Sequence, residues 1–301
     1  VMSTDISLPE GAPQEVVTNA LVRDVDLTPF GFSATLALIT LDNGLDHTRP
    51  NTFGPQSLAS LNEAITEAIG RSPAAIAITG KPFIFAAGAD LSALAFLGKR
   101  EQSLAIGKLG HDVFRRLDEC AIPTFAFING LALGGGLEVG LHCKYRTLAS
   151  TAFTALPEVF LGLVPGWGGA TILPKLIGPE RAVKVIMLNA LNNNTMMKAK
   201  DALSLGVVDA VYEPADFLER SVDFAAKVLS QKLNIERADY SSDPAWESAL
   251  ATGKAAALKK YGGAEMAAPM RALELIAAAR TNTRGAGFDA EDQTLADLTM
   301  S

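Results

Sequence analysis

The chain has 301 residues, a formal charge of −7 at pH 7 and a pI of about 5.1. This charge provides no chain-wide positive field and therefore disfavours nucleic acid or an acidic membrane surface as a partner. Hydrophobic residues make up 49% of the chain and charged residues 20%, which is typical of a folded globular protein with a substantial core.

The first predicted elements are a strand, a helix and a strand. Residues 35–41 and 74–79 are short apolar runs rich in β-branched residues, and between them 53–69 repeats its apolar residues at helical spacing. Helices and strands continue to alternate in the following segments: a helix at 103–118, a strand at 124–128, a helix at 135–143, and strands at 145–148 and 152–155. This alternation predicts an α/β fold with largely buried strands.

The pattern changes near residue 215. The remaining apolar segments have helical spacing and are separated by Gly, Pro, Ser or Asn; they are 215–231, 243–261, 269–280 and 290–300. We therefore expect a flexible leader at 1–17, a core with the active site at 18–214, and a C-terminal helical region at 215–301 that covers the core or mediates oligomerisation.

The ends and the cysteines bear on location. The leader VMSTDISLPEGAPQE is polar and contains prolines, unlike a signal peptide. The most apolar long window, 124–141, contains Asn129, Glu138 and five glycines, so no transmembrane helix is expected. Cys120 and Cys143 form no CxxC pair, which favours a reducing compartment and a cytoplasmic location.

Three segments could carry chemistry, and the first is TGKPFIFAAGADL at 79–91. Here a predicted strand ends, and Asp90 is a plausible N-cap for a helix beginning at Leu91. The backbone amides of 86–89 could donate to an oxygen that becomes negative during a reaction. A small-residue turn that merely allows close packing is the alternative interpretation.

The second segment is INGLALGGGLEVGL at 128–141, in which three glycines lead into a helix carrying Glu138. A carboxylate in the first turn can simply compensate the helix dipole. However, Leu137, Val139 and Leu141 make the helix apolar on most sides, so Glu138 has little solvent-facing surface to occupy. We therefore expect this carboxylate to face a pocket, because burying it in an apolar core without a partner would be costly.

The third segment is LPEVFLGLVPGWGGATIL at 156–173, where Glu158 follows Pro157 at the end of a predicted strand and another apolar helix comes after the glycines. Two carboxyl groups close together in a partly dry site would have their pKa values pushed apart, giving an acid and a base. That arrangement suits addition or removal of water. A solvated loop glutamate is the alternative for Glu158, and Trp167 could either pack or wall an apolar pocket.

Other classes of site have weaker support. The run GGGLEVG is one residue off the GxGxxG fingerprint of dinucleotide-binding folds, and Glu138 within its helix turn disfavours a pyrophosphate. His47, His111 and His142 are scattered without an HExxH pattern, so no metal site is expected. No GxSxG elbow occurs, and Cys143 on an apolar helix is more typical of a core than of a nucleophile.

Taken together, FAAGADL, NGLALGGGLEVGLHC and LPEVFLGLVPGWGGATILPKLIG resemble the enoyl-CoA hydratase/isomerase (crotonase) family in order and spacing, over about 34–211. The resemblance implies a crotonase-like spiral of repeated ββα units, followed by a helical C-terminal region. It also implies a coenzyme A thioester substrate without a further cofactor, and assembly as a homotrimer or hexamer.

Site residues follow from the same resemblance. The amides of Ala89 and Gly135 match the oxyanion hole of the family, and Glu138 and Glu158 match the two catalytic glutamates of its hydratases. The resemblance also assigns the amide of Gly166 to placing the water, and it puts Ala86 and Ala87 where the backbone meets the coenzyme. Hydration of trans-2-enoyl-CoA to 3-hydroxyacyl-CoA is therefore expected, with enoyl-CoA isomerisation or a non-catalytic scaffold as alternatives.

Two stretches depart from stand-alone hydratases. The sequence GGATILPKL replaces a segment close to GGTQRL, and the C-terminal 271–301 is more similar to the hydratase halves of two-enzyme β-oxidation proteins. This similarity predicts a hydratase part excised from such a protein, with a 3-hydroxyacyl-CoA dehydrogenase or thiolase as partner.

Overall fold

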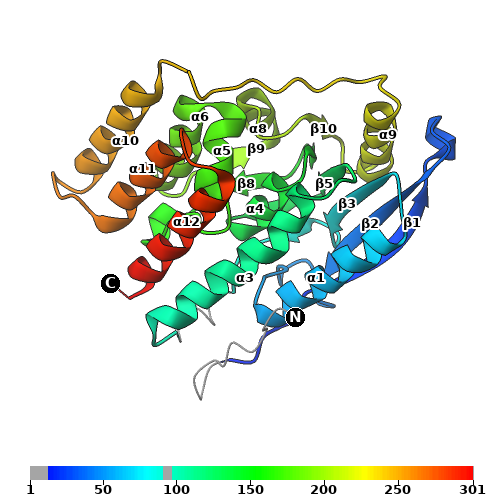
Figure 1. Ribbon diagram of the computed structural model, residues 1–301, viewed down its shortest axis with the longest axis horizontal. Coiled ribbons are helices and arrows are strands. Elements are labelled where there is room, and N and C mark those ends of the chain that lie inside the picture. Colours follow the sequence, from blue (N-terminus) through cyan, green and yellow to red (C-terminus); the bar gives the residue numbers. More distant parts are fainter. Residues whose placement is uncertain (1–12, 91–96, 301) are drawn as a thin grey trace.

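The computed structural model describes residues 13–90 and 97–300, in which helices surround two β-sheets (Figure 1). The larger sheet has the strand order β1-β2-β3-β5-β7-β10, and β1 is antiparallel to β2 while the other pairs are parallel. Its strands are β1 (Asn19–Asp26), β2 (Thr35–Asp42), β3 (Ala75–Gly80), β5 (Thr124–Ile128), β7 (Tyr145–Ala149) and β10 (Ala210–Tyr212).

The smaller sheet has the order β4-β6-β8-β9. Its strands are β4 (Ile84–Ala86), β6 (Leu131–Leu133), β8 (Phe153–Ala155) and β9 (Met197–Lys198). The chain passes from the larger sheet to the smaller one three times, from β3 to β4, from β5 to β6 and from β7 to β8. Helix α3 (Arg100–Asp118) follows the first of these pairs and α4 (Gly135–Leu141) the second, which confirms the expected α/β fold of repeated ββα units.

The strands expected to be buried are buried. Every residue of β3 and of β5 is buried, as is most of β2. Parallel strands covered on both faces need apolar side chains at consecutive positions, which is why these runs do not alternate with polar residues. Helix α1 (Pro55–Gly70), expected at 53–69, connects β2 to β3 and packs its apolar side against β1, β2 and α3.

Several short elements were not predicted. Strand β1 alternates exposed and half-buried residues at the edge of its sheet, and β4, β6 and β9 have only two or three residues, too few for a recognisable period. Helix α5 (Gly169–Ile177) is the apolar helix expected after the glycines of the third segment. The remaining short elements, which were not expected, are η1 (Thr28–Phe30), η2 (Glu158–Leu161), α6 (Pro179–Val183), η3 (Lys184–Leu188), α7 (Asn189–Leu191) and α8 (Ala199–Leu205).

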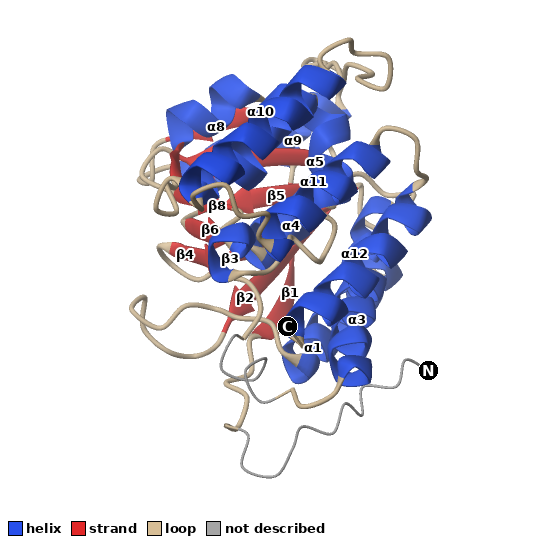
Figure 2. Ribbon diagram, turned by 90° about the vertical axis from the view of Figure 1, so that its left-hand side faces the viewer, coloured by secondary structure: helices blue, strands red, loops and turns tan. Residues whose placement is uncertain are grey.

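The four helices expected after residue 215 are present. They are α9 (Phe217–Leu229), α10 (Trp246–Lys260), α11 (Ala267–Ala279) and α12 (Arg284–Thr299). Helix α12 returns to the core and lies alongside α3, and it also contacts α5 (Figures 1 and 2). The end of the chain thereby contributes side chains to the region between α3, α4 and α5.

Glu15 belongs to the stretch expected to be a flexible leader, yet it is bound to the core. Its carboxylate accepts hydrogen bonds from the amides of Gln56 and Ser57, both at 2.9 Å, and from the Ser57 hydroxyl at 2.6 Å. These amides belong to the first turn of α1, where a carboxylate is favoured by the helix dipole. The helix expected from Leu91 lies outside the described residues.

The apolar window at 124–141 forms β5, β6 and the whole of α4 rather than one long helix. In the described ranges, no helix is both long enough and apolar enough to cross a membrane.

Candidate active site

The three segments singled out in the sequence meet around one cavity of about 260 Å³. It lies where β4 and β6 end and α4 begins, and it is closed by the turn before α5 together with side chains from α3 and α12. Most of its wall is apolar: Ile106, Leu133, Pro157, Phe160, Leu161, Leu163, Val164, Trp167 and Leu295, with Ala87, Gly88, Ala89, Gly134, Gly135, Glu138, Glu158, Gly166 and Asn194 completing it.

The backbone amides of Ala89 and Gly135 border this cavity and have no hydrogen-bond acceptor among the described residues. On one side, the amides of Ala87 and Asp90 donate to the carbonyls of Asn51 and Phe53, whereas the intervening amide of Ala89 has no acceptor. On the other side, Gly135 is the first residue of α4, so its amide has no partner within the helix. Both amides remain available to an oxygen atom in the cavity.

Glycines bring these amides close together. Gly88 has φ of +89°, and a Cβ on it would lie 3.1 Å from the amide nitrogen of Gly135. Gly134, with φ of +52°, turns the chain from β6 into α4. A side chain at either glycine would strain the backbone, and one at Gly88 would also press on the amide of Gly135.

Glu138 is 2% exposed. Its Oε1 accepts hydrogen bonds from the amides of Trp167 at 2.9 Å and Gly169 at 2.8 Å, which hold the carboxyl group against the turn before α5. Burial, reinforced by the nearby charge of Glu291, raises the pKa of Glu138 to about 7, although the two amides oppose the shift. This carboxyl group therefore exchanges a proton near neutral pH.

Glu158 lies in η2 and not at the end of a strand, because β8 ends at Ala155 and Pro157 starts a 3-10 turn. Its Oε2 is enclosed and has no hydrogen-bond partner in the described structure. Burial and the charge of Glu138 raise the pKa of Glu158 well above its usual range. The two carboxyl groups thus share one cavity and differ in environment, since two amides of the turn before α5 hold Glu138, whereas the backbone amide that acts on Glu158 is its own.

A third carboxylate, from α12, holds the same turn from the other side. Glu291 is fully buried and accepts hydrogen bonds from the amides of Gly168 at 2.6 Å and Thr171 at 2.7 Å. The amides of Trp167 and Gly169 donate to Glu138, so consecutive amides of the turn alternate between two carboxylates. The last helix therefore fixes the turn on which Glu138 depends.

His111 compensates the charge of Glu291. Its Nε2 lies 3.0 Å from Glu291 Oε2 and its Nδ1 lies 2.8 Å from Asp292 Oδ1. Although burial opposes the charged form, hydrogen bonds to the two carboxylates raise the pKa of His111 to about 9. At neutral pH the ring is an imidazolium that donates from both nitrogens.

Sequence reasoning missed Glu291, Asp292 and the role of His111. A signal was present, because Phe288, Leu295 and Leu298 follow helical spacing and position 291 falls on the same apolar face. A charged residue on an apolar face requires a buried partner. The identity of that partner, 180 residues earlier in the chain, required the tertiary structure.

Replacing His111 with Gln should destabilise the protein in a pH-dependent manner. Since the folded-state pKa of His111 is raised from 6.5 to about 9, its stabilisation is complete below pH 6.5 and disappears as the pH rises through about 9. The loss in unfolding free energy should approach about 3 kcal/mol at pH 6 and become much smaller near pH 10. Urea unfolding at these pH values measures it, with the exposed His47→Gln as control; a loss independent of pH would contradict the prediction.

The cavity brings together most of the residues expected at the site. Glu138, Glu158, Ala89, Gly135, Gly166 and Ala87 all line it, and Trp167 forms part of its apolar wall. Ala86 does not line it, because this residue is buried within β4 and its carbonyl contacts α4. Residues 13–90 and 97–300 contain no group of three or more His, Cys, Asp or Glu side chains arranged to hold a metal ion.

Comparisons with known proteins agree with this geometry. The model of the enoyl-CoA hydratase/isomerase family matches residues 31–262. The chain is 32% identical to the fatty acid oxidation complex subunit alpha of Shewanella frigidimarina over 281 residues, which is 88% of this chain and 38% of that protein. The chain thus spans little more than a third of the length of this relative.

Solved structures share the fold. An enoyl-CoA hydratase from Bacillus anthracis superposes with a TM-score of 0.58 at 24% identity, covering 81% of this chain and 90% of that one. The Mtb enoyl-CoA isomerase superposes with a TM-score of 0.60 at 20% identity, covering 87% and 98%. At such identities the likeness concerns the fold, and proteins named for either reaction possess it.

Proposed function

Because the chain belongs to the enoyl-CoA hydratase/isomerase family, we propose that it adds water across the double bond of a trans-2-enoyl-CoA to give a 3-hydroxyacyl-CoA. The observation that carries this proposal is the pair of carboxyl groups of Glu138, which is buried, and Glu158, whose Oε2 is enclosed, facing one apolar cavity beside the free amides of Ala89 and Gly135. Addition of water needs both a base and an acid. Both groups are present: burial raises the pKa of Glu138 to about 7 and the pKa of Glu158 well above its usual range.

The amides of Ala89 and Gly135 are proposed to hold the thioester oxygen. As water adds to C3, the electron pair of the double bond moves toward C2 and negative charge accumulates on this oxygen. Two fixed amides in a water-poor cavity stabilise that charge without reorganising. The free state of both amides, at the junction of β4 with α4, supports this assignment.

The two glutamates divide the proton transfers. Ionised Glu138 takes a proton from the attacking water as the C3–O bond forms, and protonated Glu158 delivers its proton to C2. A proton returns from Glu138 to Glu158 through the next water, which restores the resting state. The amide of Gly166 is proposed to place the water, and the backbone at Ala87 to contact the coenzyme, whereas Ala86 is buried away from the cavity. No further cofactor is proposed.

The wall of the cavity suits an acyl chain. Leu133, Phe160, Leu161 and Leu295 present hydrocarbon surface next to the carboxyl groups, which would both accept an apolar chain and exclude water from the raised-pKa groups.

Incubating the protein with crotonyl-CoA, and separately with medium and long enoyl-CoAs, tests the proposal. Hydration removes the conjugated double bond, so it is followed as a loss of the ultraviolet absorbance of the thioester. Turnover of at least one chain length is expected. Absence of hydration at every chain length would overturn the hydratase assignment. In that case activity on a 3-enoyl-CoA would indicate an isomerase, since one carboxyl group can move a proton between C2 and C4, and inertness toward both substrates would indicate a scaffold.

Glu291→Gln should shift the pH dependence of hydration. The charge of Glu291 raises the pKa of Glu138, so its removal should lower that pKa and move the acidic limb of the kcat/KM profile to lower pH. Gln can still accept a hydrogen bond in the turn, whereas Glu291→Ala cannot. We expect a shifted profile for Gln and a larger loss of kcat for Ala; a Gln variant with an unshifted acidic limb would contradict this.

The setting of the reaction is proposed from the relatives. Resemblance to fatty acid oxidation complex subunits favours β-oxidation in the cytoplasm, with a 3-hydroxyacyl-CoA dehydrogenase or thiolase as partner. We also propose the core at 18–214 and the helical region at 215–301 as the two parts of the chain, and a homotrimer or hexamer as its assembly. Light scattering coupled to size exclusion measures the assembly, and a monomer would overturn that part.

A further inference from the structure

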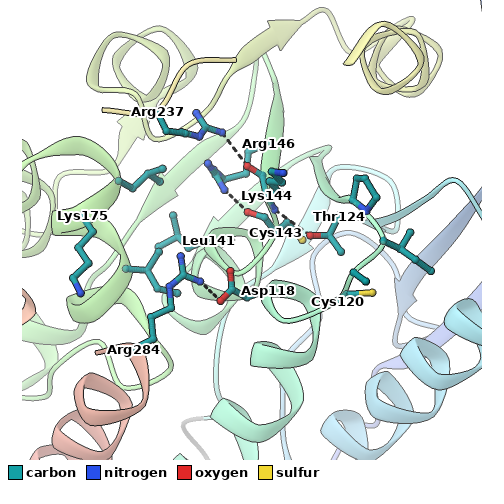
Figure 3. Close-up of a pocket in the computed structure, with 15 residues that line it drawn as sticks. Asp118, Cys120, Thr124, Leu141, Cys143, Lys144, Arg146, Lys175, Arg237 and Arg284 are labelled. Carbon is teal, nitrogen blue, oxygen red and sulfur yellow. Dashed lines mark hydrogen bonds and ion pairs between the residues drawn. The ribbon is translucent and has the colours of Figure 1, made fainter. Parts of the chain in front are cut away.

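A second cavity, of about 440 Å³, opens at the other end of α4. Glu138 and Gly135 face the first cavity from the beginning of this helix, whereas Leu141 at its end faces the second. The ends of α3 and α4, the start of β5 and the helices α5 and α12 surround this space (Figure 3). The two cavities have no lining residue in common.

Cationic side chains dominate the second cavity. Five of them line it, and the only carboxylate in its described lining is Asp118: the cations are Lys144, Arg146, Lys175, Arg237 and Arg284. Asp118 pairs with Arg284, and Asp209, which lies just outside, pairs with Arg237 at 2.6 Å. Such an excess of positive charge in one concave site raises the local concentration of anions.

Lys175 has no carboxylate partner among the described residues. Its Nζ donates only to the carbonyl of Asn282, at 2.5 Å. Burial together with the charge of Arg284 lowers the pKa of Lys175, and the charge of Asp239 opposes this shift. Lys175 and Arg284 therefore repel each other. An anion between them would relieve this repulsion.

Arg146 contributes a buried donor. This residue is 1% exposed, and its Nε and Nη1 donate to the carbonyls of Val207 and Cys143 at 2.8 and 2.6 Å. Its Nη2 is buried without a hydrogen-bond partner, and the nearest carboxylate oxygen, of Asp209, is 4.0 Å away. Figure 3 shows this guanidinium between Arg237 and Leu141, at the side of the cavity. A buried guanidinium N–H without an acceptor is costly unless a ligand supplies one.

The rest of the wall is apolar. Leu141, Ile172 and Leu176 lie among the cations, and Ile122 and Pro123 continue the surface toward the start of β5. A volume of about 440 Å³ falls within the range of small-molecule sites, roughly 300 to 1,000 Å³. The site therefore suits a ligand with a hydrocarbon or aromatic body and a compact, multiply charged anionic group.

We propose that this cavity binds a small organic phosphate, with its phosphate group between Lys175, Arg284 and the Nη2 of Arg146 and its apolar body against Leu141 and Ile172. Guanidinium and ammonium donors fit the oxygens of a phosphate dianion, which matches several cations better than a single carboxylate would. The proposal is independent of the hydratase assignment. It concerns a site at the end of α4 remote from the two glutamates.

Phenyl phosphate serves as the probe, because it joins an aromatic body to one phosphate and lacks the adenine and pantetheine parts of coenzyme A. Calorimetric titration of the whole protein, in the presence of saturating acetoacetyl-CoA, should show binding with a Kd in the micromolar to low millimolar range, about 10⁻⁵ to 10⁻³ M. Inorganic phosphate should bind more weakly and phenol not measurably. Absence of phenyl phosphate binding, or its displacement by the coenzyme, would overturn the proposal.

Variants locate the binding. The double variant Lys175→Ala/Arg284→Ala should bind phenyl phosphate at least 10-fold more weakly, because two of the three side chains that donate hydrogen bonds to the phosphate group are lost. Asp118→Asn should increase the affinity for phenyl phosphate, because the carboxylate that competes for Arg284 is removed. Lys200→Ala, an exposed lysine of α8 outside the cavity, is the charge-matched control. Equal weakening by Lys200→Ala, or an unchanged Kd in the double variant, would show general charge attraction and refute the site.

Discussion

Glu158→Gln and Glu138→Gln should each lower kcat for enoyl-CoA hydration by about 10² to 10⁴-fold, the range that general acid or base catalysis contributes. Gln retains the size of the side chain and removes only its ability to exchange a proton. Because acid and base act in one event, the double variant should be little worse than the poorer single variant. Steady-state rates with crotonyl-CoA at pH 7.5 measure these losses.

Binding and stability separate loss of chemistry from loss of structure. Affinity for acetoacetyl-CoA should stay within a few-fold of the unsubstituted protein in both variants. Glu158→Gln should also raise the melting temperature at pH 8, by about 2 °C for each kcal/mol gained. The reason is that a carboxyl group whose pKa is raised in the folded state costs stability once the pH exceeds its unfolded value, near 4.5.

Glu63→Gln provides the matched control, since Glu63 is an exposed glutamate of α1 far from the cavity. It should leave kcat unchanged. Retention of more than a third of the hydration rate in Glu158→Gln would contradict its assignment as the proton donor to C2. Loss of acetoacetyl-CoA binding in either variant would indicate a structural role instead.

The sequence could predict the parts of the site that lie within continuous segments. Glu138 stands out because its neighbours in α4 are apolar, and Gly135 follows a strand at a helix start, so both were recognisable without tertiary contacts. The three segments also converge as expected, because the ends of parallel strands meet at one edge of a sheet. The order of the main strands and helices followed from their apolar periods.

Contacts between distant parts of the chain were beyond prediction. The bonds of Glu291 to the turn at Gly168, and of His111 to Glu291, depend on how α12 packs between α3 and α5. The cationic cavity likewise collects Lys175, Arg237 and Arg284 from separate elements, none of which belongs to a local motif. Strand β1 lies at the edge of its sheet and has no buried residue, and β9 has only two residues, so neither strand has a detectable hydrophobic period.

Gly136 of α4 explains why the free amides of Ala89 and Gly135 keep their spacing. A Cβ on Gly136 would lie 1.9 Å from the carbonyl oxygen of Ala86 and 2.5 Å from its carbonyl carbon. The backbone of α4 therefore rests directly on the backbone of β4, one residue before the loop that carries Ala89. No side-chain rotation can relieve such a contact, because the carbonyl belongs to the main chain and the Cβ is held rigidly by its own main chain.

Gly136→Ala should accordingly destabilise the fold by more than about 4 kcal/mol, a loss reserved for severe clashes and buried defects. Any folded fraction should hydrate crotonyl-CoA at least 10²-fold more slowly, since a displacement of about 1 Å between catalytic groups has that effect. Gly140→Ala is the matched control in the same helix, because its Cβ would meet Ile128 Cδ1 at 3.4 Å, an ordinary contact. That variant should be neutral or gain up to about 1 kcal/mol from the better helix propensity of Ala. Urea unfolding followed by far-UV circular dichroism compares the two, and equal unfolding midpoints would show that the contact between α4 and β4 does not set the spacing of the amides.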